Sequence, residues 1–203
     1  MSYCDGIISQ DILQDCENPV VGGVERTGII VNRSDIDFSL TEFETGADAR
    51  KNVITKIGLK DGKKAYRVVI STNQPFTGTI TTLEVGTNRN TFTNNVGMVI
   101  LNNDPDVCAN VIDGLATGEF VCILENKYKN INKDTNPGDS AFQIYGYYQG
   151  LSTTTLENDK YSEDTEGGWN VVLTEANSPK SALFYFDTDI NTTRAKIESL
   201  TAA

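Results

Sequence analysis

Residues 140–154 read SAFQIYGYYQGLSTT, a stretch dense in aromatic and β-forming side chains. Four aromatic residues, an isoleucine and a leucine fall within positions 142–151, and glycines stand at 146 and 150. Such a composition is typical of a strand, so we expect one strand over the whole stretch. In a strand Tyr145 and Tyr147 point to one face, and Ile144 and Tyr148 to the other, unless Gly146 forms a bulge. The aromatic group is then divided between two faces.

Similar patterns recur on both sides of this stretch. Further strands are expected over 24–40, 66–72, 77–86, 95–103 and 118–129, and a hairpin with a turn at Asn177 and Pro179 over 167–187. Helices are expected over 104–118, where Asp104 or Asp106 is a suitable cap, and over the tail that follows Asp187. Because about seven strands follow one another in hairpin-like order, we predict a mainly β fold. It would be an antiparallel sandwich or barrel with one or two peripheral helices, including a C-terminal helix.

The 203 residues contain no internal repeat or low-complexity linker, so we expect a single domain over 1–203. Residues 1–23 alternate acids with apolar residues until Pro19 and the Gly22-Gly23 pair, and they are predicted to form an N-terminal arm. Residues 41–65 are polar and interrupted by glycine. This segment is predicted to be a long loop with a short element near 53–59.

The formal net charge is −11, but residues 51–100 carry seven bases and two acids. An acidic chain is poorly suited to gripping nucleic acid, which requires Lys and Arg on phosphates. The basic segment 50–67 is either a solvated loop or helix end, or a contact with an acidic face of a neighbouring subunit. In the second interpretation the inter-subunit residues are Arg50, Lys51, Lys56, Lys60, Lys63 and Lys64.

Little in the sequence indicates catalysis. The chain has no histidine, which excludes Ser-His-Asp and Cys-His nucleophilic sites, and it has no glycine-rich phosphate-binding motif. Its four cysteines, at positions 4, 16, 108 and 122, match no metal-binding spacing. We therefore expect no enzyme activity, no cofactor, no metal and no small-molecule substrate. The N-terminus lacks a secretory pattern and no apolar run is long enough to span a membrane, so we expect synthesis in a cytoplasm and no membrane contact.

One string near the C-terminus resembles a calcium loop. Asp187, Asp189, Asn191 and Glu198 stand at positions 1, 3, 5 and 12 of an EF-hand pattern. Position 6 is Thr192, however, where the sharp turn needs glycine. The simpler interpretation is that Asp189, Asn191 or Thr192 caps the terminal helix, and bound calcium is the alternative.

Two blocks of the chain resemble tail-tube-like virion proteins of Bacteroidetes phages, including those of the crAss-like sort. The first is the start, with Cys4, Ile12, Cys16 and the stretch PVVGGVERTGIIVNRSDID over 19–37. The second is 145–187, with Gly146, Gly150-Leu151, Gly168-Trp169 and Phe184–Phe186. Together they cover about 60 residues, and the middle of the chain departs from the family.

This resemblance implies a β-sandwich or barrel protomer that closes into a ring of six or twelve copies. Such rings join sheet edges between neighbours, with a long loop reaching onto the adjacent subunit. The expected function is a passive virion channel in the tail or neck, whose partners are its own copies and neighbouring tail or neck proteins. An acidic lumen repels phosphates, so DNA passes without binding. The protein would be made in the host bacterial cytoplasm and reside in the virion.

A rival hypothesis is a glycan-binding module of a phage fibre or surface protein. Its stacking residues would be Tyr145, Tyr147, Tyr148 and Trp169. The division of the tyrosines between two strand faces weakens such a platform. For Trp169, an anchor in the core or at a subunit interface is the alternative.

Overall fold

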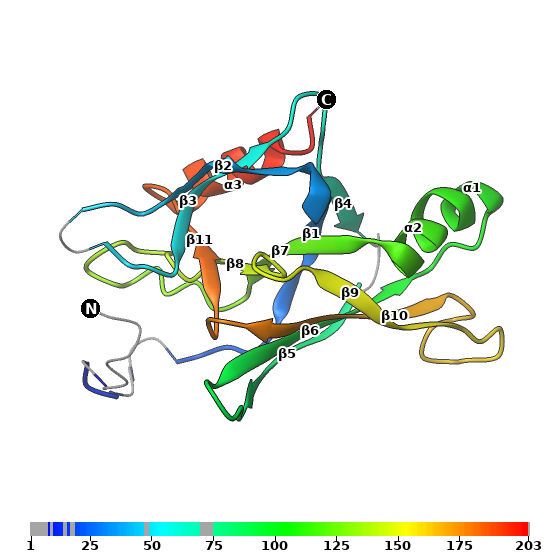
Figure 1. The fold of residues 1–203 in the computed structure, drawn as a ribbon, viewed down its shortest axis with the longest axis horizontal. Helices are drawn as coiled ribbons and strands as arrows, with labels where there is room; N and C mark the ends of the chain where they lie inside the picture. Colours follow the sequence, from blue (N-terminus) through cyan, green and yellow to red (C-terminus); the bar gives the residue numbers. More distant parts are fainter. Residues whose placement is uncertain are drawn as a thin grey trace.

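The computed structural model of this protein describes residues 8, 10–13, 16, 19–46, 49–69 and 75–202. Eleven strands form one mixed sheet in these residues (Figure 1). They are β1 (Val24–Asn32), β2 (Ile36–Phe43), β3 (Val53–Leu59), β4 (Tyr66–Val69), β5 (Phe76–Glu84), β6 (Thr91–Ile100), β7 (Glu119–Asn126), β8 (Phe142–Tyr145), β9 (Leu151–Asn158), β10 (Trp169–Ser178) and β11 (Leu183–Tyr185). The mainly β class with few helices is confirmed.

The helical segments agree well with the expected positions. They are a 3-10 turn η1 (Arg33–Asp35), the continuous run α1 (Pro105–Val107), η2 (Cys108–Ile112) and α2 (Asp113–Thr117), and the terminal helix α3 (Ile190–Ser199). The run begins where the Asp104 carboxylate accepts the backbone N–H of Val107 at 2.8 Å. Both predicted helices are therefore confirmed, because caps and helical periodicity are local signals.

The sheet divides into two branches at the stretch 140–154. β7 pairs with β1 along one edge, and its other edge is shared by β8 and the start of β9. From β8 the pairing continues through β11 and β3 to β2, and from β9 it continues through β10 and β6 to β5. Residues 146–150 connect β8 to β9 and therefore mark the point where the branches diverge.

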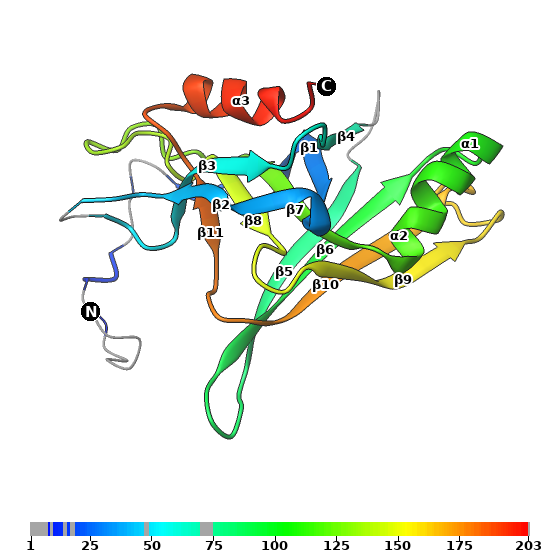
Figure 2. The ribbon, with the colours of Figure 1, turned by 45° about the horizontal axis from the view of Figure 1, so that its top comes forward.

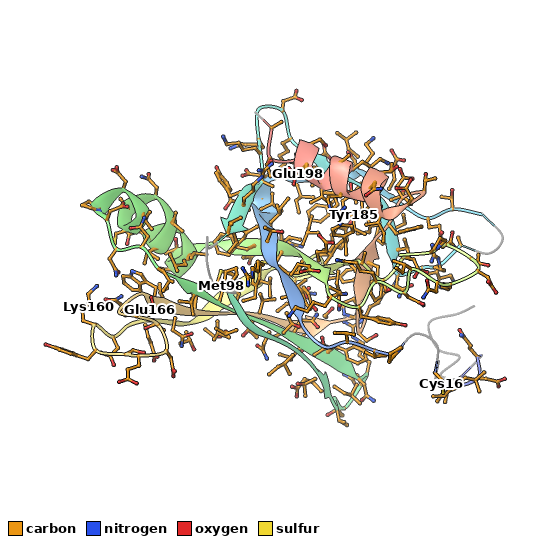
Figure 3. All side chains as sticks on the ribbon, turned by 180° about the vertical axis from the view of Figure 1, so that it is seen from behind. Cys16, Met98, Lys160, Glu166, Tyr185 and Glu198 are labelled. Atoms are coloured by element: carbon orange, nitrogen blue, oxygen red, sulfur yellow. The ribbon has the colours of Figure 1, made fainter. Side chains whose placement is uncertain are left out.

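Two hydrophobic cores lie on the two faces of β7. Val121 and Ile123 point into the first core, beside β1, β3, β8, β11 and α3, whereas Cys122 and Leu124 point into the second, beside β6, β9 and β10. Figure 3 labels one member of each core, Tyr185 beneath α3 and Met98 on β6. Because both faces of β7 are buried, the strand reads as an unbroken apolar run, FVCIL.

Three predicted elements differ from the structure. The expected single strand over 140–154 is wrong, since Gly146 and Gly150 take φ of +85° and +86° and turn the chain back on itself. The expected strand over 24–40 is two strands joined by η1. In the predicted long loop over 41–65, the short element expected near 53–59 is confirmed as β3, but the segment also holds the end of β2 and is therefore less of a loop than expected.

The hairpin predicted over 167–187 does not form either. Two strands are present, but β10 already pairs with β9 on one edge and β6 on the other. The chain therefore crosses to the first branch, where β11 pairs antiparallel with β8 and parallel with β3 (Figure 1). An interior strand has no free edge for its sequence neighbour, and this cannot be read from local turn residues.

The N-terminal arm lies partly outside the described residues. Those of residues 1–23 that the structure describes belong to no helix or strand, and the apolar ones among them are exposed. Residues 70–72, which fall at the end of the strand expected over 66–72, also lie outside the described part.

Candidate assembly surface

The β5 strand is one end of the hydrogen-bonded path through the sheet and pairs only with β6 among the described strands. Beyond Thr79, every residue of β5 is exposed. The β5–β6 hairpin projects from the body of the molecule, as Figure 2 shows. One side of the β5–β6 hairpin therefore presents the backbone N–H and C=O groups of an unpaired strand edge to solvent.

The residues of β5 do little to protect that edge. Its sequence is FTGTITTLE, which contains no lysine, arginine or proline and only one acid, Glu84. Ile80 and Leu83 are 61% and 50% exposed. The register of β5 with β6 shifts once, between Phe76 and Gly78, and is regular from there to Glu84. Proteins ordinarily blunt an open edge with charges, proline or bulges, and this regular part, with Glu84 as its one charge, is a site of pairing with another chain.

The edge at the opposite end of the path is better protected. β2 carries Asp37 and Glu42, and its register with β3 shifts twice, which indicates bulges. Hydrogen bonds from the side chain and backbone of Ser39 lower the pKa of Asp37, so this carboxylate stays charged. The contrast between the two ends singles out β5 as the candidate assembly edge.

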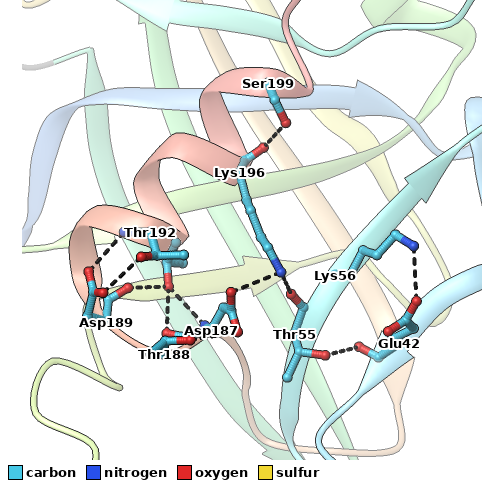
Figure 4. Close-up of polar contacts among 10 residues, drawn as sticks. Glu42, Thr55, Lys56, Asp187, Thr188, Asp189, Thr192, Lys196 and Ser199 are labelled. Carbon is cyan, nitrogen blue, oxygen red and sulfur yellow. Dashed lines mark hydrogen bonds and ion pairs between the residues drawn. The ribbon is translucent and has the colours of Figure 1, made fainter.

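The predicted inter-subunit bases lie along β3 and the turns beside it. Arg50 donates to both Glu44 carboxylate oxygens, and its guanidinium also pairs with Asp139. The side-chain hydrogen bond from Arg50 holds the pKa of Glu44 below its ordinary value. Lys56 pairs with Glu42 at 3.0 Å (Figure 4).

Of the remaining bases, Lys51 precedes β3, and Lys60, Lys63 and Lys64 follow it. The Lys60 ammonium donates to the carbonyl of Ser34 at 2.7 Å, and Lys63 lies 3.4 Å from the carboxylate of Asp35. Lys51 and Lys64 are exposed. Arg50, Lys56, Lys60 and Lys63 thus pair with groups of their own subunit, and a contact of the six bases with a neighbouring subunit stays a prediction.

The string from Asp187 to Glu198 forms a capped helix (Figure 4). Asp189 accepts the backbone N–H groups of Asn191 and Thr192 at 2.7 and 2.9 Å, which lowers its pKa. Asp187 pairs with Lys196, and Glu198 pairs with Arg67. The capping interpretation is confirmed, and the four side chains of the calcium pattern have separate partners.

Burial of the aromatic residues argues against the glycan platform. Tyr145 lies in the second core at 4% exposure, and Tyr147 lies in the first core at 7%. Tyr147 contacts the rings of Phe38, Phe43 and Tyr148 edge to face. Trp169 packs partly buried against the second core, as an anchor does. These residues are packing groups rather than an exposed stacking surface.

Sequence reasoning missed two features of this molecule. One is the open β5 edge, for which the threonine run without lysine or proline was an available signal. The other is Glu175, a carboxylate 2% exposed that the sequence does not distinguish from 27 other acids. Within the described residues, no helix is long and apolar enough to cross a membrane, and no three cysteine or carboxylate side chains gather as a metal site would require. Comparison with protein-family models, with curated proteins and with solved structures found no match.

Proposed function

We propose that this chain is a structural protein of a phage virion, a tail-tube-like subunit whose copies form a ring of the tail or neck channel. The observation that carries this proposal is the unprotected β5 edge on a projecting hairpin. A second chain that pairs with this edge satisfies its backbone groups and covers Ile80 and Leu83. The proposed partners are six or twelve copies of the chain and the neighbouring tail or neck proteins.

A ring requires that each subunit use two different surfaces. The two ends of the sheet path differ in charge and in exposed side chains, and the register shifts twice at β2 but once at β5, so the two ends are different surfaces. Contact between β5 and a different surface of the next copy is heterologous, and such contacts close into rings when the rotation permits.

The charge of the chain supports a passive channel. A net charge of −11 favours a surface that repels DNA phosphates, so a genome moves past it without binding. The proposed mechanism consists of shape, subunit contacts and charge, without catalysis. The protein would be made in the host bacterium and incorporated into the virion.

The test changes the β5 edge. In the double variant Ile80→Lys, Thr82→Lys, two exposed positions gain charge, so we expect rings to be lost while the far-ultraviolet circular dichroism spectrum is retained. Negative-stain images and the mass in solution measure assembly. Ile131→Lys is the matched control, because Ile131 is 59% exposed and lies outside the strands. A strictly monomeric wild type would refute the proposed function, and rings in the double variant would refute the role of β5.

A further inference from the structure

A pocket of about 750 Å³ lies at the end of the molecule that carries α1 and α2. Its walls come from β4, from the end of β6 and from the helical run, with apolar side chains such as Val68, Ile100 and Val111. Among the described residues that line it, Arg67 is the only charged one. Pockets of this size and character are built for an apolar occupant with an acidic or polar margin.

The N-terminal arm has the complementary composition. Its described apolar residues are almost fully solvated, with Ile12 86%, Leu13 83% and Ile8 79% exposed. Residues 1–23 contain four acids and no lysine or arginine. An isolated exposed leucine is ordinary, but a terminal segment with several large apolar side chains in solvent indicates a partner surface.

We propose that the N-terminal arm of one subunit docks its Ile12–Leu13 region into the pocket beside α1 and α2 of the next subunit. This inference rests on the proposed ring and identifies a second contact within it. Apolar side chains of the arm fill the apolar pocket, and the acids of the arm, such as Asp11, lie near Arg67, which also pairs with Glu198 of its own subunit.

The positions of arm and pocket favour exchange between copies. Cys16 of the arm lies at one end of the molecule, and α1 and α2 lie at the other (Figure 3). Two complementary surfaces at opposite ends of one subunit form a heterologous contact, which repeats from copy to copy. In a closed ring, the pocket of every subunit is then occupied by the arm of a neighbouring subunit.

Native cysteines make this contact measurable. Cys108 neighbours Val107 of the pocket wall, and Cys16 lies four residues beyond Ile12, about 14 Å in an extended chain. Cys122 is fully buried, and burial raises the pKa of its thiol to about 12, so it does not react at neutral pH and can be retained.

The experiment mixes two variants of the full chain. One keeps Cys16 and carries Cys4→Ser and Cys108→Ser, and the other keeps Cys108 and carries Cys4→Ser and Cys16→Ser. After assembly of the mixture, a bis-maleimide with a spacer of about 13 Å is added. We expect a covalent dimer from the mixture that is absent when either variant is treated alone. In a chain that retains both cysteines, a linked monomer without linked dimers would show that each arm occupies its own pocket, and would overturn the proposal.

A pocket-filling variant tests the occupancy directly. Gly114 lines the pocket, and a Cβ built there meets no heavy atom within 4 Å, so Gly114→Phe adds a large apolar side chain from an open position of the pocket wall. We expect about tenfold less cross-linked dimer, because a large apolar contact of the arm is excluded. Gly114→Ala is the matched control. It adds one methyl group to the same position and should leave the dimer yield unchanged.

The outcomes for ring and arm can be separated. Rings that form in both Gly114→Phe and a chain lacking residues 1–18, together with no cross-linking in the wild-type background, would overturn the arm inference and leave the proposed ring intact. Failure of the wild type to assemble would refute the ring itself. Unchanged cross-linking in Gly114→Phe would show that the arm contacts a surface other than this pocket.

Discussion

At the scale of single residues, Glu175 organises the junction between the two branches of the sheet. Its buried carboxylate accepts the backbone N–H groups of Gly146, Tyr148 and Gln149 at 3.0 to 3.1 Å, and the side-chain amide of Asn94 at 2.9 Å. Convergent backbone N–H groups form a nest that suits an anion. A residue on β10 thus fixes the turn that separates β8 from β9.

Removal of this carboxylate should destabilise the fold strongly. Glu175→Ala leaves one buried and two part-buried N–H groups without an acceptor, so we expect a loss of about 3 kcal/mol in the free energy of unfolding, measured by urea titration. Glu175→Gln keeps one carbonyl oxygen and should lose less. A loss below about 1 kcal/mol for the alanine variant would contradict the role given to Glu175.

The contact between Glu175 and the turn at residues 146–150 could not be predicted from the sequence, because the turn itself was not predicted. Glycines at 146 and 150 suggested a bulge at most, because their positive φ is required only by the return of the chain from β8 to β9. A Cβ on Gly146 would lie 2.4 Å from the carbonyl oxygen of Phe120, a contact set by residues far away in the sequence. The division of Tyr145 and Tyr147 between two cores has the same origin.

At the scale of elements, α3 is joined to the central strand by ion pairs. Glu125 at the end of β7 lies 2.7 Å from Arg194 of α3 and 3.0 Å from Lys129. Burial raises the pKa of Glu125, but hydrogen bonds from Arg194 and Lys129 outweigh this effect and hold the pKa below its ordinary value of 4.5. The carboxylate therefore stabilises the docking of the helix in its charged form.

This pairing predicts a specific dependence on pH. A lowered folded-state pKa contributes stability above the unfolded-state pKa, near 4.5, and the contribution is lost as the pH falls through the folded-state value. We expect Glu125→Gln to lower the free energy of unfolding by about 1 kcal/mol at pH 7. The difference from the parent chain should shrink below pH 4.5.

Urea titrations between pH 7 and pH 3 measure this difference, in the Ile80→Lys, Thr82→Lys background so that assembly does not contribute. Glu157→Gln, at an exposed acid of β9, is the control. A difference for Glu125→Gln that is constant across this pH range would contradict the assignment.

Elements with local signals were predicted, and elements with distant partners were not. The helices follow from Asp104 and Asp189, whose capping positions are visible in the sequence. The pairing of β10 and β11 depends on which strand edges are already occupied, and that is a property of the whole sheet. The polar, glycine-interrupted composition of 41–65 suggested a loop with only a short element near 53–59, and the burial of Ile54 and Ile57 in that element depends on partners elsewhere in the chain.

At the scale of the whole molecule, the two proposed contacts are made mainly by backbone groups and apolar side chains, and the acids of the arm near Arg67 are their one charged part. Such contacts are little screened by salt, and burial of apolar surface is not weakened by it. The alternative assembly through Arg50, Lys51, Lys56, Lys60, Lys63 and Lys64 depends on charge. Salt therefore separates the two modes of assembly.

We expect the fraction of the chain that is assembled into rings to vary by no more than about twofold between roughly 50 and 500 mM sodium chloride. Analytical ultracentrifugation measures this fraction. If the β5 edge and the N-terminal arm alone hold the ring, the triple variant Lys60→Glu, Lys63→Glu, Lys64→Glu should assemble like the wild type. Dissociation of rings at high salt, together with loss of assembly in the triple variant, would show that the basic segment forms the subunit contact.

The position of β7 also has a consequence for how the chain reaches its native state. Val31 of β1 pairs with Val121 of β7, about 90 residues later, and the junction at residues 146–150 is completed only by Glu175. On the ribosome, β1 can pair early with β4 along one edge, but its other edge waits for β7, which follows after more than half of the chain. Folding dominated by such distant pairings is slow, on the order of milliseconds to seconds. Until β7 is synthesised, the strand edge of β1 that pairs with it has to remain unpaired with the strand edges of other nascent chains.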